Sequence, residues 1–210
     1  MRILVFGDSI VYGSWAAEHG WVDLLKREAH KRTIESEGRT KLQVLNLGIS
    51  SDSSTKILKR MPNEIESRSS ASWPFLFVFS FGTNDQRTTD GQVETPIEQF
   101  EANVTAIICE ARLHTDKILF VGTPPMTQPV AVLKNQEYSD ARLKEYEERL
   151  VAILKAESIP FVSIRPVFEQ AGFGSLYAYD HAHPNDAGHK LIAATVLPEL
   201  DKLLGSSVAR

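Results

Sequence analysis

The chain has 210 residues, of which 42% are hydrophobic and 24% charged, and its formal net charge is -4. This length and composition predict one soluble globular domain over residues 1–210, with a core that needs no disulfide. An acidic chain without a basic block is not expected to bind nucleic acid. The single cysteine, Cys109, excludes an intrachain disulfide, and its apolar neighbours predict a buried, unreactive thiol.

No apolar run approaches the roughly 18 residues that cross a bilayer, so we expect no stable membrane insertion. The first apolar run, residues 3–6, is too short for the core of a signal peptide. We therefore expect a cytoplasmic protein. The oligomeric state is not readable from the sequence.

Short apolar runs alternate with stretches of helical periodicity along the chain. Runs of this length, rich in Val, Ile, Leu and Phe, are typical of strands buried on both faces. The alternation predicts a parallel sheet covered by helices on both sides, with a last helix over about residues 186–204 that Pro198 is expected to kink. The runs expected to be strands are residues 3–6, 42–47, 75–81, 118–121 and 161–164.

In such a sheet, ligands bind beyond the carboxyl ends of the strands, so catalytic residues are expected directly after the apolar runs. Glycine and polar residues occupy these places. The segments that follow the runs are residues 7–10, 48–52, 82–85, 122–125 and, after a longer loop, 180–185.

Ser9 follows the first run at a turn from strand to helix, which Gly7 allows to be tight. The N–H groups and the dipole at a helix start favour negative charge, as in the tetrahedral intermediate of acyl transfer. This place suits a serine nucleophile, but such a serine needs a base. The alternative is that Ser9 is only a helix cap.

His183 is the expected base, because Asp180 lies three residues before it and can hold its Nδ1 while Nε2 faces Ser9. The alternative is a surface turn with a capping aspartate. The chain order Ser, Asp, His is that of α/β-hydrolases, but Gly7-x-Ser9-x-Val11 and the short spacing between Asp180 and His183 differ from that fold.

Asn84 supplies a side-chain amide at the end of the third run, where it could donate to the developing oxyanion. Its alternative is an Asx turn in the loop. The coincidence of these signals at strand ends that meet at one edge favours the catalytic interpretation.

These segments resemble the sequence blocks of the SGNH hydrolase family, also called GDSL esterases/lipases. The resemblance implies a three-layer α/β/α flavodoxin-like fold with a five-stranded parallel sheet. It also implies hydrolysis of esters or thioesters, with no metal or organic cofactor. The segments that carry it, over about residues 3 to 195, are 7–9, 46–52, 82–85 and 180–184, with a first helix near 20–25.

One position departs from the family pattern. The second block usually has a glycine before its aspartate, whose N–H stabilises the oxyanion, and Ser51 stands there in this chain. If the family geometry needs a positive φ, a serine is strained by about a kcal/mol or more. We expect the oxyanion hole to combine the N–H groups of Ser9 and Ser51 with Asn84, and Gly48 is a lesser candidate.

Three other interpretations stay open. A metal could be bound by His181, His183 and His189 with Asp180, a non-catalytic flavodoxin-like domain could bind a small ligand, and an acyltransferase could use the same triad. A small-molecule ester is the expected substrate. Its pocket could be lined by part of Phe168, Phe173, Tyr177 and Tyr179, and edged by residues 124–138.

Overall fold

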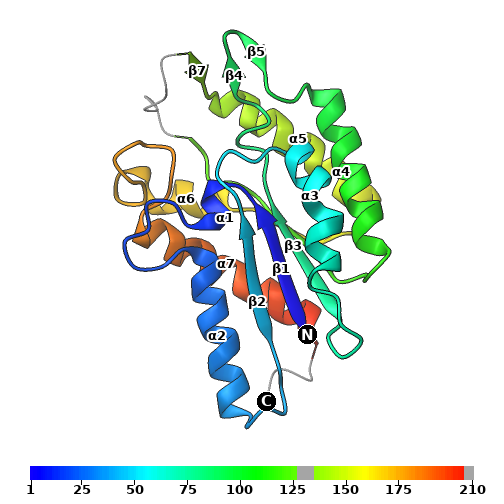
Figure 1. Cartoon of the computed structure of the whole chain (residues 1–210). Coiled ribbons are helices and arrows are strands. Elements are labelled where there is room, and N and C mark those ends of the chain that lie inside the picture. Colours follow the sequence, from blue (N-terminus) through cyan, green and yellow to red (C-terminus); the bar gives the residue numbers. More distant parts are fainter. Residues whose placement is uncertain (127–134, 206–210) are drawn as a thin grey trace.

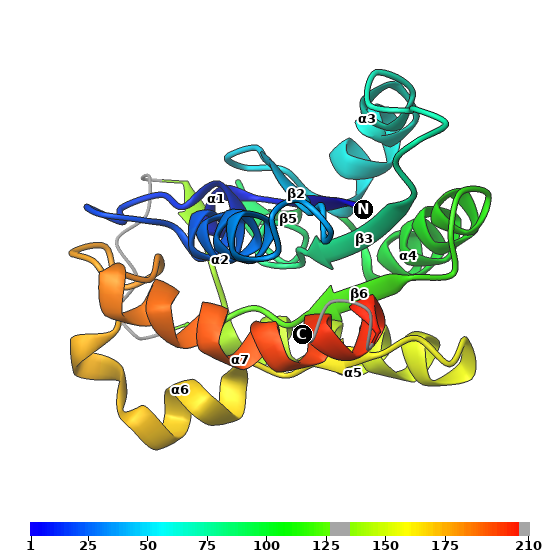
Figure 2. The same ribbon diagram turned by 90° about the horizontal axis from the view of Figure 1, so that it is seen from below.

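A computed structural model of the chain describes residues 1–126 and 135–205. A parallel five-stranded sheet lies at its centre, and helices cover both faces (Figures 1 and 2). This confirms the predicted three-layer α/β fold. In spatial order the strands are β2 (Gln43–Gly48), β1 (Arg2–Gly7), β3 (Phe75–Ser80), β6 (Ile118–Val121) and β8 (Phe161–Val162).

The central strand β1 is paired in parallel with β2 and β3, so these strands end at the same level. Gly7 lies opposite Gly48 on one side and Ser80 on the other. The segments that follow the three strands therefore leave the sheet side by side.

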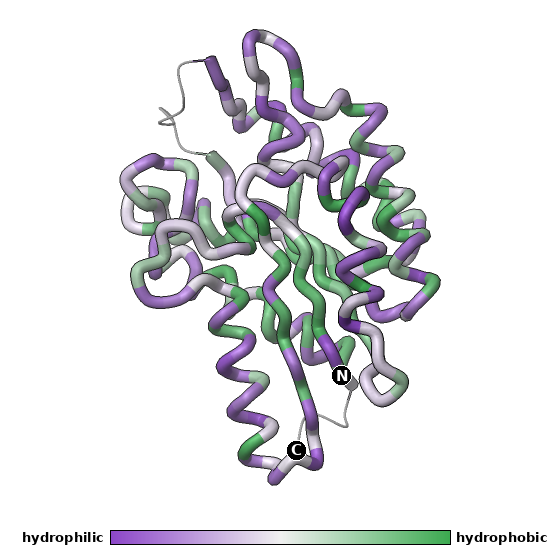
Figure 3. The backbone as a smooth tube through the Cα atoms, in the orientation of Figure 1, coloured by the Kyte–Doolittle hydropathy of each residue, from purple (hydrophilic) through white to green (hydrophobic). Residues whose placement is uncertain are grey.

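Successive residues of the strands pack on opposite faces of the sheet, as the period of two requires. On β1, Ile3 and Val5 pack with the first group of helices, whereas Leu4 and Phe6 pack with the second. Figure 3 shows hydrophobic residues concentrated along the sheet, between more polar helices. The first group is α2 (Trp21–Glu35), α6 (Arg165–Ala171) and α7 (Asp186–Leu204); the second is α3 (Ser54–Glu66), α4 (Ile97–Arg112) and α5 (Asp140–Ala156).

The elements missed by the sequence are short. They are an antiparallel sheet in the order β5 (Gln92–Val93), β4 (Thr88–Thr89), β7 (Gln136–Glu137), besides α6 and the 3-10 turn Phe173–Ser175. The helix expected to start at Ser9 is present as the short α1 (Ser9–Tyr12). Elements of two to seven residues carry no readable hydrophobic period. The last helix has the predicted extent, and Pro198 lies inside it.

The prediction that Cys109 is buried is wrong, because its side chain is exposed on α4. The helix buries Val104, Ile107, Ile108 and Ala111 on its inner face. At 100° per residue, position 109 turns away from that face although its sequence neighbours are apolar. None of the described helices is long and apolar enough to span a bilayer.

His189 of α7 is fully buried and joins two helices of the first group. Its Nδ1 accepts a hydrogen bond from the backbone N–H of Trp21, the first residue of α2, at 3.3 Å. Burial disfavours the imidazolium and lowers the pKa of His189 to about 4. The helix contact therefore requires the neutral ring.

This lowered pKa predicts a loss of stability in acid. In the unfolded chain the pKa of His189 is near its ordinary value of 6.5, whereas in the folded protein it is about 4. The contribution of His189 is thus complete above pH 6.5 and falls as the pH drops towards 4, by about 3 kcal/mol at the limit. Urea unfolding at pH 7.5 and 4.5 measures this change in the free energy of unfolding.

His189→Gln should flatten this pH dependence relative to the wild type. The exposed His30 of α2 provides the control His30→Gln, which should keep the pH dependence of the wild type. Burial also raises the pKa values of Asp8 and Asp85 to about 6, but these residues are common to all variants and cancel in the comparison. An equal pH dependence in His189→Gln and the wild type would show that the buried ring is not the cause.

Candidate active site

The turn between β1 and α1 leaves no space for larger residues. A Cβ on Gly7 would lie 2.2 Å from the carbonyl oxygen of Ser80 and 2.2 Å from Val11. The next residue, Asp8, caps α1, since its Oδ1 accepts from the N–H of Ile10 at 2.9 Å. Ser9 is therefore the first residue of the helix and not its cap, which removes the capping alternative.

Ser9, His183 and Asp180 form one hydrogen-bonded chain across 174 residues of sequence. Ser9 Oγ lies 2.8 Å from His183 Nε2, and His183 Nδ1 lies 2.6 Å from Asp180 Oδ2. A carboxylate can only accept, so Nδ1 carries the proton and Nε2 is left to accept from the serine hydroxyl. The arrangement can thus remove a proton from Ser9.

The carboxylate of Asp180 is held by its own turn. Its Oδ1 accepts from the backbone N–H groups of Ala182 at 3.1 Å and His183 at 3.0 Å. Burial raises the pKa of Asp180, but these bonds and the imidazole outweigh it, and the net pKa lies below the ordinary value. Asp180 therefore stays ionised beside the histidine.

Asn185 anchors the end of this turn to the fold. Its side-chain oxygen accepts from the N–H groups of Ala187 and Gly188 and so caps α7. Its amide donates to the carbonyl groups of Ser175 and Tyr177. The position of His183, two residues earlier, is thus set by the start of a long helix.

The segment after β2 brings Ser51 to the same edge of the sheet. Ser51 has a φ of +64°, in the left-handed region that favours glycine. The N–H of Gly48 donates to Asn46 Oδ1 at 2.9 Å, so this group is already engaged. A Cβ on Gly48 would also lie 2.2 Å from the backbone nitrogen of Tyr12, which explains the glycine by close packing on α1.

Arg60 of α3 fastens this segment to the sheet. Its Nε donates to Asp52 Oδ2 at 2.8 Å, and its Nη2 donates to the carbonyl of Leu47 at the end of β2. The ion pair is largely shielded from solvent on both sides. Arg60 therefore ties the residues around Ser51 to the strand that precedes them.

Asn84 is buried, with 4% of its surface exposed, and its amide orientation is set by two bonds. Nδ2 donates to the carbonyl of Asp52 at 3.0 Å, and Oδ1 accepts from the hydroxyl of Tyr138 at 3.3 Å. One N–H of the amide remains for another acceptor. An Asx turn would join Asn84 to residues next to it in the sequence. These contacts join Asn84 to residues 32 and 54 positions away, so they are not those of an Asx turn.

Trp15 and Arg60 contact residues of the site, but sequence reasoning did not identify them. Trp15 donates its indole N–H to Asp180 Oδ2 at 2.8 Å. It lies in a loop without hydrophobic period, where no sequence signal marks it. Arg60 could have been sought as a partner for Asp52, because Asp52 lies just before α3 and Arg60 lies within that helix, eight positions later.

The metal interpretation has little to support it in the described residues, where no group of three or more metal-binding side chains occurs. The two ring nitrogens of His183 are each engaged already, Nε2 with Ser9 and Nδ1 with Asp180. His189 is buried, and its Nδ1 is engaged with Trp21.

The aromatic residues predicted near the pocket divide into two kinds. Phe168 and Tyr177 are buried and pack on each other, with ring centroids 5.6 Å apart. Phe173 and Tyr179 are exposed. Of the predicted pocket edge, residues 127–134 lie outside the described part of the chain, and Tyr138 reaches Asn84.

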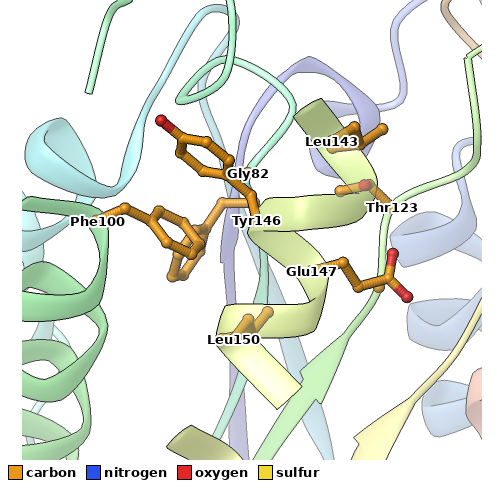
Figure 4. A pocket seen from close by; sticks show the side chains of 9 residues that line it. Gly82, Phe100, Thr123, Leu143, Tyr146, Glu147 and Leu150 are labelled. Carbon is orange, nitrogen blue, oxygen red and sulfur yellow. The ribbon is translucent and has the colours of Figure 1, made fainter. Parts of the chain in front are cut away.

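A small cavity of about 10 Å³ lies near the ends of β3 and β6, beneath α5 (Figure 4). The rings of Phe100 and Tyr146 lie on one side of it, and the carboxyl group of Glu147 points to the other side. Burial raises the pKa of Glu147. The cavity has room for about one water molecule, so it is too small for an ester.

Comparisons with solved structures agree with this fold. A lipase/acylhydrolase from Enterococcus faecalis is 24% identical, with a TM-score of 0.73 over 95% of this chain and 94% of that one. An α/β hydrolase from the metagenome of Lake Arreo is 19% identical, with a TM-score of 0.72 over 98% and 96%. An acetylxylan esterase from Geobacillus stearothermophilus is 19% identical, with a TM-score of 0.70 over 95% and 93%.

A comparison with curated proteins returned no match. The sequence model of the GDSL-like lipase/acylhydrolase family matches residues 5–191, a range that contains every residue of the hydrogen-bonded chain at the sheet edge. The protein therefore belongs to the GDSL-like lipase/acylhydrolase family and is a hydrolase of ester bonds.

Proposed function

We propose that the protein cleaves small carboxylic esters or thioesters through an acyl-serine intermediate on Ser9, within a single domain over residues 1–210. The observation that carries this proposal is the hydrogen-bonded chain of Ser9, His183 and Asp180, at 2.8 and 2.6 Å. Each member has the partner that its chemical role requires.

In the first half of the reaction, His183 Nε2 takes the proton of Ser9 as Oγ attacks the ester carbonyl. Asp180 keeps the ring in the required tautomer and stabilises the imidazolium. The tetrahedral intermediate collapses, and the alcohol or thiol leaves with the proton from Nε2. The product of this half is the acyl ester of Ser9.

In the second half, water replaces the leaving group. His183 Nε2 takes a proton from the water as it attacks the acyl carbonyl, and then returns this proton to Ser9 Oγ. The acid is released, and the site regains its starting state. An alcohol in place of water would give acyl transfer, which product analysis with added alcohols detects.

The oxyanion is proposed to accept hydrogen bonds from three donors at the strand ends. The N–H of Ser9 lies in the first turn of α1, where N–H groups have no acceptor within the helix. The free N–H of the Asn84 amide and the backbone N–H of Ser51 complete the set. Gly48 is not included, because its N–H is bonded to Asn46.

The substrate is proposed to be a short ester, with sugar acetyl esters and lysolipids as the classes to test first. Trp15 and Tyr179 leave 53% and 76% of their surfaces exposed, and Trp15 lies beside His183. Such rings offer apolar faces to a leaving group. One structurally similar protein, from Geobacillus stearothermophilus, is an acetylxylan esterase.

Ser9→Ala should lower kcat for p-nitrophenyl acetate by at least about a thousandfold, because no acyl-enzyme can form. Melting temperature should stay near that of the wild type, which separates lost chemistry from lost folding. Comparing turnover of the acetate, butyrate and octanoate esters by the wild type measures how long an acyl chain the pocket accepts. Equal turnover by Ser9→Ala and the wild type would refute the proposal.

Asn84→Ala should lower kcat by about 10²–10³ and change KM little, because the proposed bond forms mainly in the transition state. Steady-state kinetics with p-nitrophenyl acetate measures the two constants. The exposed Asn63 of α3 provides the control Asn63→Ala, which should leave both unchanged. An effect of Asn84→Ala on KM alone would contradict the oxyanion role.

Ser51→Gly should stabilise the protein while keeping activity. The left-handed backbone costs a serine about 1–2 kcal/mol, of which the greater freedom of glycine in the unfolded chain cancels part. A net gain of about 1 kcal/mol raises Tm by about 2–4 °C. The N–H donor is kept, so kcat should not fall.

Two variants control this test. Ser51→Ala keeps the strain and should give no gain in Tm. Ser158→Gly relieves a similar φ of +55° after α5 and should raise Tm without touching the site. A lower Tm in Ser51→Gly would mean that the serine side chain, and not the backbone, stabilises this turn.

A further inference from the structure

Trp15 contacts both partners of Ser9 in the hydrogen-bonded chain. Its indole N–H donates to Asp180 Oδ2 at 2.8 Å, the same oxygen that accepts from His183 Nδ1 at 2.6 Å. Its ring meets the imidazole of His183 edge to face, with centroids 6.1 Å apart at 89°. One oxygen of Asp180 is therefore fixed by two donors that lie against each other.

The backbone of Trp15 is strained, with a φ of +66°, which is rare for a bulky residue. Such strain persists only where the surroundings over-determine it, and it clusters at functional sites. The conformation brings the indole onto Asp180, whose bond to it spans 165 residues.

Contacts on both sides of Trp15 hold this conformation. Before it, the N–H groups of Gly13 and Ser14 donate to the carbonyl of Ser9, at 3.0 and 2.9 Å. After it, the N–H of Glu18 donates to Asp186 Oδ1 at 2.9 Å, at the start of α7. The loop is thus fastened to the nucleophile at one end and to the helix that follows His183 at the other.

We propose that Trp15 is a positioning residue, which orients Asp180 and sets how strongly its carboxylate attracts the protonated imidazole of His183. This inference rests on the proposed function. The indole N–H keeps Oδ2 in the plane where Nδ1 can reach it. It also takes a share of the negative charge on Oδ2, so the carboxylate holds the imidazolium less strongly.

Other charged groups near His183 are the same with and without Trp15. Asp180 lies on the same turn, Asp8 precedes α1, and His189 lies on α7. Asp180 accepts from the indole, whereas the printed partners of Asp8 and His189 are the backbone N–H groups of Ile10 and Trp21. A change in the pH dependence of a Trp15 variant is therefore assigned to the lost donor.

Trp15→Phe removes the donor and keeps an aromatic ring. We expect kcat for p-nitrophenyl acetate to fall about tenfold, the effect of one hydrogen bond to a charged group, while KM stays within about twofold. We expect the acid limb of the pH–rate profile to move to higher pH, because a carboxylate without the indole donor attracts the imidazolium more strongly. Trp73→Phe, which changes a tryptophan that precedes β3 at the far end of the sheet, is the matched control.

A second readout does not depend on turnover. The chain has three tryptophans, and only the fluorescence of Trp15 is expected to be quenched when His183 beside it takes up a proton. The wild type and Trp73→Phe should show a quenching step as the pH is lowered through the acid limb of the pH–rate profile. Trp15→Phe and His183→Gln should lack it.

These readouts distinguish failure of the inference from failure of the proposed function. If the wild type hydrolyses no ester, the proposed function fails, and the fluorescence step still decides whether Trp15 senses His183. The inference is overturned if Trp15→Phe keeps kcat and the acid limb of the control, or if only its KM rises, as for a substrate contact.

Discussion

The level ends of three parallel strands are the constraint on which the site depends. Gly7, Gly48 and Ser80 lie opposite one another in the register of β2, β1 and β3. Because parallel strands all end at one edge, the segments that follow them must share that edge. Gly7 and Gly48 have no space for a Cβ, so their close packing fixes α1 against the strands that carry Ser51 and Asn84.

His183 reaches this edge from the far end of the chain, and it does so through helix capping. The start of α7 is set by Asn185, and the turn before it is set by the bonds to Asp180. The hydrogen bond between Ser9 and His183 thus joins two rigid elements, each positioned by local backbone contacts. Such rigidity suits a site whose function is proposed to require a fixed nucleophile and base.

Much of this arrangement was predictable from sequence because strong local signals coincide. Continuous apolar runs predicted the strands, and the polar residues directly after them included Ser9 and Asn84, whereas Asp180 follows the last strand after a longer segment. The positive φ of Ser51 agrees with the glycine that the family usually has at this position. The catalytic roles of these residues remain predictions, although the hydrogen bonds between them support these roles.

What could not be predicted depends on contacts between distant segments. The bond from Trp15 to Asp180 and that from Tyr138 to Asn84 leave no trace in local pattern. Cys109 was misjudged because apolar neighbours in sequence do not share a helix face. The short antiparallel sheet of β5, β4 and β7 has strands of two residues each, too few for alternation to be read.

The central claim is that Ser9 is a nucleophile activated by His183. Its most direct test is to react the folded protein with a fluorophosphonate and to locate the adduct by intact mass and peptide mapping. The account predicts one adduct per chain, on Ser9, which forms far more slowly in His183→Ala. An adduct on another residue, or no adduct on the folded wild type, would contradict it.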